Sequence, residues 1–433
     1  MSPFTQTTGM KPIQISESVW YSPEYHFLFS CGGNEKKATE NLQKYVASSG
    51  IRTVASRAVN GNGCEDSLLP HPSTLQRSLK TLTVELTSAC NLGCSYCYLF
   101  GSGRLENQQS CSTSRHATTG NILHRISCSI EETCQPELTI QFIGGEPLLN
   151  FSTLIILLAE IRKVARRHSK QVHLQIITNG TLLTKKVWDV LEDYEVEVLL
   201  SLDGPAAIQN VLRPLRNGGE TSDLILRNIR GHEAKTSILF MLCKQTTGLT
   251  KNLKWFLDRG FHAVSFNYVY TADPTVALTR QDLDNILADI DNHKDFYANN
   301  FRHIRNFRRF AESFPISRPR LCACNAGQNY AALGIDGEYY LCQRGFGIKS
   351  LRLDDMRKES SPHKLHSVLE DRYCSQCWAR HICGGLCWFN PLFWPDDYRE
   401  LRCYFTRELI KRVGHTFFID RKDSFGYAST ETC

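Results

Sequence analysis

The regular alternation of short β-rich runs with longer helix-like segments is the feature that most constrains the fold of this chain. Six β-rich runs between residues 81 and 315 are each followed by a segment with helical periodicity, the last by one long helix expected over about 278–311. The six runs lie at 81–87, 137–145, 172–180, 196–204, 236–243 and 263–270. Because strands separated by helices pair in parallel through crossovers, the pattern predicts an α/β fold. Six units are two fewer than a closed eight-unit barrel needs, so we expect a partial (β/α)6 TIM-type barrel.

Composition and charge limit the class of protein. The 433 residues have room for two or three domains, and 42% hydrophobic with 22% charged residues is ordinary for a soluble globular protein. A formal net charge of +6 is too small to indicate nucleic-acid binding. The polar N-terminus lacks the apolar core of a signal peptide, and the longest apolar run, 154–161, is too short to span a bilayer. We therefore expect a cytoplasmic protein without a nucleic-acid or membrane partner.

The 18 cysteines cluster in two places. Three lie within 90–97, and eight more lie between 322 and 403. A disulfide framework is typical of small secreted domains, whereas grouped thiols in a reducing compartment indicate metal binding. The distribution therefore predicts metal centres in two regions of the chain.

The first group, Cys90, Cys94 and Cys97, follows the run at 81–87. A structural zinc site needs four closed ligands, and no fourth Cys or His lies near these three. Three thiolates on a [4Fe–4S] cluster leave one iron open to a substrate or cofactor. The spacing favours such a cluster, with a zinc site as the alternative.

Polar and glycine residues follow the other strand-like runs at the ends where parallel strands place active sites. They are Gly144, Gly145 and Glu146, then Thr178 and Asn179, then Ser201 and Asp203. We expect them to converge with the cysteine loop on one rim. The polar stretch 101–120 after that loop is expected to be a lid or a long connection.

Together these motifs resemble the radical SAM enzymes. The resemblance implies that Cys90, Cys94 and Cys97 hold a [4Fe–4S] cluster whose open iron binds the amino and carboxylate groups of S-adenosyl-L-methionine. Tyr96 takes the aromatic position beside the adenine. The GGEP motif at 144–147 implies binding of the methionine amino group, to which the Glu146 carboxylate is suited.

The same resemblance implies further contacts to this cofactor. Residues expected to contact its ribose or methionine part are Thr178, Asn179, Ser201 and Asp203. Arg213 is expected to pair with the methionine carboxylate, with Arg216 as the alternative.

The second cysteine group resembles the SPASM domain, a C-terminal extension with two auxiliary [4Fe–4S] clusters. The resemblance assigns Cys374, Cys377, Cys383 and Cys403 to one cluster. It assigns Cys324, Cys342 and Cys387 to the other, for which Cys322 is the nearest candidate fourth ligand and an open iron is the alternative. A zinc-ribbon-like fold is the competing interpretation. The predicted domains are an N-terminal extension (1–75), the radical SAM partial barrel (80–315), the SPASM domain (316–410) and a tail (411–433).

The N-terminal extension is expected to be a small α+β unit. The segment 18–33 predicts one or two strands, and 36–50 predicts a helix that ends at Gly50. By resemblance such a unit is winged-helix-like and captures a leader peptide by strand addition, whereas a plain extension that caps the barrel fits equally well.

The resemblance implies a radical enzyme that acts on a peptide. A reduced cluster would cleave S-adenosyl-L-methionine to a 5′-deoxyadenosyl radical, which abstracts a substrate hydrogen. We expect a maturase that cross-links a ribosomally made precursor peptide through a C–C, ether or thioether bond, with an electron donor such as flavodoxin or ferredoxin. Alternatives are a peptide epimerase, a sulfatase-maturing enzyme and a non-catalytic iron–sulfur or zinc protein. Sulfatase-maturing members carry Asp where this chain has Gln343, and no catalytic base is assigned.

Overall fold

A computed structural model describes most of the chain. The described residues are 12–16, 19–22, 27–30, 34–49, 72–99, 118–314, 320, 322–356, 368, 370–387, 389 and 396–420. The expected lid at 101–120 lies largely outside them. Internal contacts divide the chain into two units. We name residues 69–282 with 325–364 the barrel unit, and residues 1–68, 283–324 and 365–433 the cysteine-rich unit.

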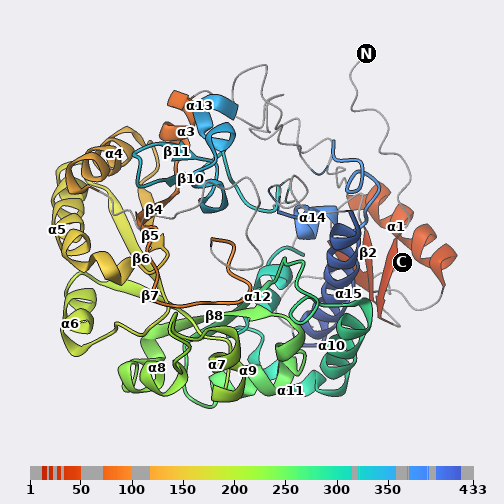
Figure 1. Cartoon of the computed structure of the whole chain (residues 1–433). Coiled ribbons are helices and arrows are strands. Elements are labelled where there is room, and N and C mark those ends of the chain that lie inside the picture. The colour runs from red at the N-terminus through yellow and green to blue at the C-terminus, as the bar shows by residue number, and fades with distance from the viewer. Residues whose placement is uncertain are drawn as a thin grey trace. The chain divides into compact units, whose positions relative to one another are not determined.

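The barrel unit is built on one curved sheet with the strand order β11-β10-β4-β5-β6-β7-β8-β9 (Figure 1). Its strands are β4 (Thr81–Thr87), β5 (Glu137–Gly144), β6 (Gln171–Thr178), β7 (Val196–Ser201), β8 (Thr236–Leu242), β9 (Ala263–Tyr268), β10 (Tyr330–Leu333) and β11 (Tyr339–Tyr340). All neighbouring pairs are parallel except β10 and β11. The six predicted strands and their parallel pairing are confirmed, and the α/β partial-barrel class with them.

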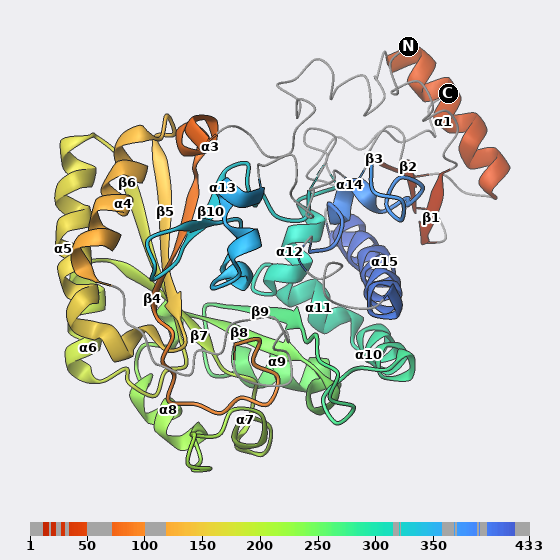
Figure 2. The same ribbon diagram turned by 45° about the horizontal axis from the view of Figure 1, so that its top comes forward.

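Helices α4 (Thr119–Glu132), α5 (Phe151–Arg167), α6 (Lys185–Asp193), α7 (Ala206–Leu212), α8 (Ser222–Asn228) and α9 (Leu249–Leu257) connect successive strands from β4 to β9 as crossovers. Helix α3 (Pro72–Ser78) precedes β4, and α13 (Leu353–Met356) follows β11. Figures 1 and 2 both show α4, α5 and α6 along the same side of the sheet. In α5, Leu154, Leu157, Leu158 and Ile161 are fully buried, at the spacing that places residues on one face of a helix. Burial of that stripe against the sheet holds the strand ends in register.

The cysteine-rich unit holds a separate antiparallel sheet and most of the C-terminal helices. Its strands are β1 (Ile13–Ser16), β2 (Val19–Ser22) and β3 (Phe27–Ser30). Its helices are α1 (Glu35–Ser49), α11 (Lys294–Asn300), α12 (Arg305–Ala311), α14 (Arg380–Cys383) and α15 (Asp396–Asp420), together with most of α10 (Arg280–Asn292). The predicted helix that ends near residue 50 is confirmed, and the N-terminal sheet has one strand more than expected.

Two sequence-based boundaries in this region differ from the structure. The single helix expected over about 278–311 is wrong, because α10, α11 and α12 are separate helices. The breaks follow Asn292 and Asn300, and asparagine is common where helices end. They let the rings of Tyr297 and Phe307 stack at 4.8 Å. The start of the predicted tail, at 411, lies inside α15.

The described helices include none that is both long and apolar enough to cross a bilayer.

Candidate functional site

The cysteine loop after β4 is anchored to the segment that follows α7. Gly93 N donates to Pro214 O at 2.8 Å, and Ser95 N donates to Leu212 O at 3.2 Å. The Arg216 guanidinium adds a bond of 2.7 Å from Nε to the carbonyl oxygen of the first cysteine. The loop is therefore fixed by residues more than a hundred positions away in the sequence.

The three predicted cluster cysteines lie within electrostatic reach of one another. Burial raises the pKa of Cys90 to about 11 and that of Cys94 to about 12, and the charges of the neighbouring cysteines, Cys97 included, add to both shifts. Grouped, buried thiols stay protonated unless a cation binds them, and iron binding would release those protons. The donor set is therefore soft and suited to an iron–sulfur cluster.

The spacing of the thiols bears on the competing zinc interpretation. Within the described ranges, no group of three or more His, Cys, Asp or Glu side chains lies close enough to hold a single metal ion. Each thiolate of an iron–sulfur cluster binds a different iron, so cluster ligands stand further apart than the ligands of one zinc ion. The geometry is thus compatible with a cluster.

Two glycines bring β5 against the cysteine loop. Gly145 N donates to Thr87 O, and Glu146 N donates to Ala89 O, both at 2.8 Å. A Cβ on Gly144 or Gly145 would stand 2.2 Å from the backbone oxygen of Thr87 or Ala89, respectively. Only glycine permits this approach, so the predicted motif holds the loop against the strand end as well as facing the rim.

The Glu146 carboxylate is fully buried and is held by three protein donors. Oε1 accepts from Leu148 N at 3.1 Å and from Thr178 Oγ1 at 2.7 Å, and Oε2 accepts from Asn179 N at 2.8 Å. Burial raises its pKa to about 7 even though each of these bonds lowers it. Glu146 therefore ties the end of β5 to the end of β6, which leaves less of its oxygen surface for an ammonium group than the sequence implied.

The end of β6 reaches back to the cysteine loop through two amides. Asn179 Nδ2 donates to Asn91 Oδ1 at 2.9 Å, and Asn91 Nδ2 donates to Thr181 Oγ1 at 2.8 Å. The hydroxyl and amide of Thr181 both donate to Asn179 Oδ1. These residues form a closed polar network beside the first cysteine.

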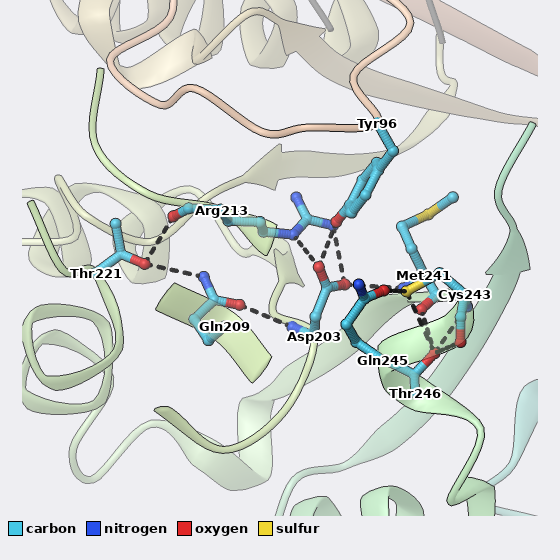
Figure 3. Close-up of polar contacts among 9 residues, drawn as sticks. All are labelled: Tyr96, Asp203, Gln209, Arg213, Thr221, Met241, Cys243, Gln245 and Thr246. Atoms are coloured by element: carbon cyan, nitrogen blue, oxygen red, sulfur yellow. Dashed lines mark hydrogen bonds and ion pairs between the residues drawn. The ribbon is translucent and has the colours of Figure 1, made fainter. Parts of the chain in front are cut away.

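A buried triad of Tyr96, Asp203 and Arg213 lies at the end of β7 (Figure 3). Asp203 Oδ2 accepts from the Tyr96 hydroxyl and from Arg213 Nε at 2.8 Å, and Oδ1 accepts from Arg213 Nη2 at 3.3 Å. The guanidinium also lies 5.3 Å from the centre of the Tyr96 ring. Asp203 has no exposed surface, and its charge raises the pKa of Arg213 against the effect of burial. Arg213 is thus engaged by Asp203 in this structure.

Residues around the triad fix the position of Asp203. Met241 N, on β8, donates to Asp203 Oδ1 at 2.9 Å, and Asp203 N donates to Gln209 Oε1 at 2.9 Å. Gln209 in turn donates to Thr221, whose hydroxyl donates to the Arg213 carbonyl (Figure 3). Strands β7 and β8 and helix α7 therefore converge on Asp203.

Ser201, the last residue of β7, is half-buried, and its hydroxyl has no hydrogen-bond partner among the described residues. The structure thus brings the predicted residues of the barrel unit to one rim.

Several residues that shape the rim were missed from the sequence. They are Asn91, Thr181, Gln209 and Thr221, together with the amide of Met241. Asn91 directly follows the first cysteine, which was the one signal available. The others carry no motif, because their role depends on the way the loops fold back.

One auxiliary cysteine set is assembled within the cysteine-rich unit. The charges of Cys383 and Cys403 act on Cys374, and Cys377 acts on both Cys383 and Cys403. Burial raises the pKa of Cys374 to about 12 and that of Cys383 to about 11. Four soft thiols placed together fit the four ligands of a [4Fe–4S] cluster.

The other set is divided between the two units. Cys322, Cys324 and Cys387 belong to the cysteine-rich unit, whereas Cys342 is buried in the barrel unit after β11. Their assignment to one cluster stays a prediction.

Comparisons with known proteins identify the class. Residues 84–246 match the model of the Radical SAM superfamily. The solved structure of native anSMEcpe with bound AdoMet and Cp18Cys peptide matches with a TM-score of 0.63 at 18% identity, over 79% of this chain and 99% of that one. At this identity the likeness shows the fold.

Three curated relatives differ in how much of the chain they match. The cysteine-type anaerobic sulfatase-maturating enzyme of Clostridium perfringens (strain 13 / Type A) is 23% identical over 71% of this chain and 88% of that enzyme. The antilisterial bacteriocin subtilosin biosynthesis protein AlbA of Bacillus subtilis is 22% identical over 74% of this chain and 70% of AlbA. The radical SAM cyclopropyl synthase TigE of Paramaledivibacter caminithermalis is 30% identical over 36% of this chain, and the match spans about a third (32%) of TigE.

Residues 84–246 therefore form a radical SAM domain. The chain has homologues among the anaerobic sulfatase-maturating enzymes and in AlbA. The predicted resemblance to radical SAM enzymes is confirmed.

Proposed function

We propose that this protein modifies a ribosomally synthesised precursor peptide, most simply by forming an intramolecular C–C, ether or thioether cross-link. The observation that carries the proposal is a three-cysteine loop on a radical SAM rim together with a second, four-cysteine set in the same chain. An oxidative cross-link removes two electrons and two protons from the peptide. One electron and one proton leave together as the abstracted hydrogen atom. An auxiliary cluster is a suitable acceptor for the other electron, and the other proton passes to solvent.

The barrel rim would hold the initiating cofactors. Cys90, Cys94 and Cys97 would hold a [4Fe–4S] cluster with S-adenosyl-L-methionine on its open iron. When bound and reduced, this pair supplies a 5′-deoxyadenosyl radical that abstracts a substrate hydrogen. The protein's own task is to fix the loop and exclude water, and the Tyr96–Asp203 bond holds one wall of the site.

Peptide substrates are supported by the relatives. AlbA is named for bacteriocin biosynthesis, and the matched anSMEcpe structure contains a peptide. The N-terminal sheet β1–β2–β3 followed by α1 is compatible with a unit that captures a leader peptide along a strand edge. The proposal includes four domains, with the limits 1–75, 80–315, 316–410 and 411–433. It also includes a cytoplasmic location and an electron donor such as flavodoxin or ferredoxin. The contact-based units group the residues differently from these limits.

Sulfatase maturation is the second candidate, because the Clostridium perfringens enzyme matches over most of its length. Gln343 bears on this alternative: its side-chain oxygen accepts a hydrogen bond from the Tyr330 hydroxyl. A neutral amide does not accept a proton at neutral pH, so the residue at this position is not suited to act as a base.

The two functions separate in one anaerobic assay. Reconstituted full-length protein is incubated with S-adenosyl-L-methionine, a reductant and either the short peptide encoded beside its gene or a cysteine-containing sulfatase peptide. Loss of two hydrogens from the precursor supports cross-linking, and unchanged mass with inversion of one residue supports epimerisation. Conversion of the sulfatase cysteine to an aldehyde, with no change in the precursor, would replace the proposal with the second candidate.

A further inference from the structure

An arginine lies against the four-cysteine set of the cysteine-rich unit. Arg399 stands one helical turn before Cys403 on α15, so both residues share a face of that helix. Its Nη2 donates to Cys374 Sγ at 3.9 Å. Arg399 is thus in contact with one sulfur of the set and on the same helix face as another.

The rest of the Arg399 side chain is held in place. Nη2 also donates to Asp371 Oδ1 at 2.5 Å, and the guanidinium lies 4.2 Å from the centre of the Tyr373 ring. Asp371 Oδ1 accepts from the amides of Tyr373 and Cys374 as well, so one carboxylate orients both the arginine and the cysteine loop. The Arg399 side chain is 11% exposed, and its Nε is buried without a hydrogen-bond partner among the residues that the structure describes.

Further positive charge lies on the Cys383 side of the set. The guanidinium groups of Arg309 and Arg320 both donate to the carbonyl oxygen of Ala323, at 2.9 and 3.1 Å. Desolvation and the nearby charge of Arg320 lower the pKa of Arg309, although its side chain is exposed, and the charge of Cys383 opposes the shift. Within the described ranges, neither arginine forms an ion pair with a carboxylate.

Water screens the charge of an exposed arginine such as Arg309, so Arg399, whose Nη2 contacts Cys374 Sγ, is the cation that acts most directly on these sulfurs. A [4Fe–4S] cluster with four thiolates is a net anion, and one further electron makes it more negative. Hydrogen bonds to the sulfurs and nearby charge are known controls of cluster reduction potential. The N–H···S bond and the charge of Arg399 therefore favour the cluster state that carries the extra electron, whereas the Asp371 carboxylate beside Arg399 opposes it.

We infer that Arg399 tunes the cluster held by Cys374, Cys377, Cys383 and Cys403, and that its N–H···S bond and its charge make this cluster the easier electron acceptor. The inference rests on the proposed function, which places a cluster at these cysteines. In the step concerned, the second electron of the oxidative cross-link passes from the peptide to the cluster. The electron transfer itself forms or breaks no covalent bond and moves no proton. Arg399 is a positioning and tuning residue and does not contact the substrate.

The test is an EPR-monitored redox titration of full-length reconstituted protein. Cys90, Cys94 and Cys97 are all replaced by Ala, so that only auxiliary clusters give a signal, and an added Cys374→Ala substitution identifies the signal of this set. Arg399→Gln should lower the equilibrium constant for reduction of that cluster about tenfold, which for a one-electron couple equals ~59 mV. Arg399→Lys should retain most of the wild-type potential, because it keeps the charge.

Arg372→Gln is the matched control. Arg372 also lies over the Tyr373 ring, at 4.6 Å, but it is 75% exposed and pairs with Asp396 at 3.1 Å. Its replacement should leave the potential unchanged. The inference is supported if Arg399→Gln lowers the potential and Arg372→Gln does not. It is also supported if Arg399→Gln loses the cluster and Arg399→Lys retains it.

Three other results have distinct meanings. An Arg399→Gln potential equal to that of Arg372→Gln, with full cluster content, overturns the inference and leaves the proposed function intact. Cluster loss in both Arg399 variants overturns it too, because the role would then be structural. A protein whose iron content does not change with Cys374→Ala removes the cluster assignment itself.

Discussion

Replacing Asp203 with Asn should destabilise the barrel unit more than any exposed charge substitution in it. Asp203 is fully buried and accepts hydrogen bonds from Tyr96, Arg213 and the Met241 amide. The substitution keeps the shape of the side chain but removes the charge that compensates the Arg213 guanidinium, of whose side chain only 11% is exposed.

The magnitude follows from the burial of both partners. Removing one partner of a buried ion pair costs about 3–5 kcal/mol, because the other charge stays buried without compensation. Arg213→Met in the Asp203→Asn background removes that stranded charge, so the double variant should be less destabilised than the sum of the single ones. An interaction energy of about 1–3 kcal/mol is expected from the cycle.

Two measurements read this out. Urea unfolding of the anaerobic protein gives the change in free energy of unfolding, and hydrogen–deuterium exchange of β8 reports the site locally, because the Met241 amide donates to Asp203. A loss of 3–5 kcal/mol corresponds to a fall in protection of about 10²- to 4 × 10³-fold where exchange follows global opening. Asp189→Asn is the control, since Asp189 pairs with Lys185 on the exposed face of α6 and should change stability by less than about 1 kcal/mol.

Equal effects of Asp203→Asn and Asp189→Asn would refute the reasoning. So would strict additivity of Asp203→Asn and Arg213→Met, because the pair would then not interact. A large effect of Asp203→Asn that Arg213→Met partly reverses would establish the triad as an energetic unit.

Two further substitutions test the rim and the sheet. Gly145→Ala places a Cβ 2.2 Å from the Ala89 carbonyl oxygen, so it should displace the cysteine loop and abolish S-adenosyl-L-methionine cleavage, whereas Gly120→Ala, with open space around it, should leave cleavage unchanged. A fully active Gly145→Ala enzyme would contradict the proposed packing. Burial raises the pKa of Glu85 from 4.5 to about 7, and the charge of Asp336 adds a smaller contribution. Between pH 4.5 and about pH 7, Glu85 is therefore protonated in the folded chain and ionised in the unfolded chain. Stability contributed by Glu85 is therefore complete below pH 4.5 and is lost as the pH rises through about 7, and Glu85→Gln should flatten this slope in urea unfolding by about one proton. An unchanged slope would show that Glu85 ionises normally.

Much of the barrel could be predicted because strand signals in parallel sheets are local. The strand expected at 81–87 has those bounds, and the one expected at 263–270 ends two residues early. The edge pair β10–β11 was missed, because its strands are short and join β4 from some 250 residues away. The break between α10 and α11 was also missed, since helical periodicity continues across it.

The candidate site shows the same division. Strand ends predicted which residues would gather, and the structure places Glu146 and Asp203 at one rim. What these side chains do there depends on donors from other elements, such as the Asn179 amide and the Met241 amide. Backbone amides leave no mark in a sequence, so the internal role of both carboxylates was not predictable.

The most direct test of the account combines iron analysis with detection of 5′-deoxyadenosine. Anaerobically reconstituted wild-type protein should contain about twelve irons per chain, the number for three four-iron clusters, and should form 5′-deoxyadenosine from S-adenosyl-L-methionine. With Cys90, Cys94 and Cys97 replaced by Ala, the iron content should fall to about eight and 5′-deoxyadenosine should disappear. If that variant keeps both its iron content and its cleavage activity, the assignment of the radical site to this loop is wrong.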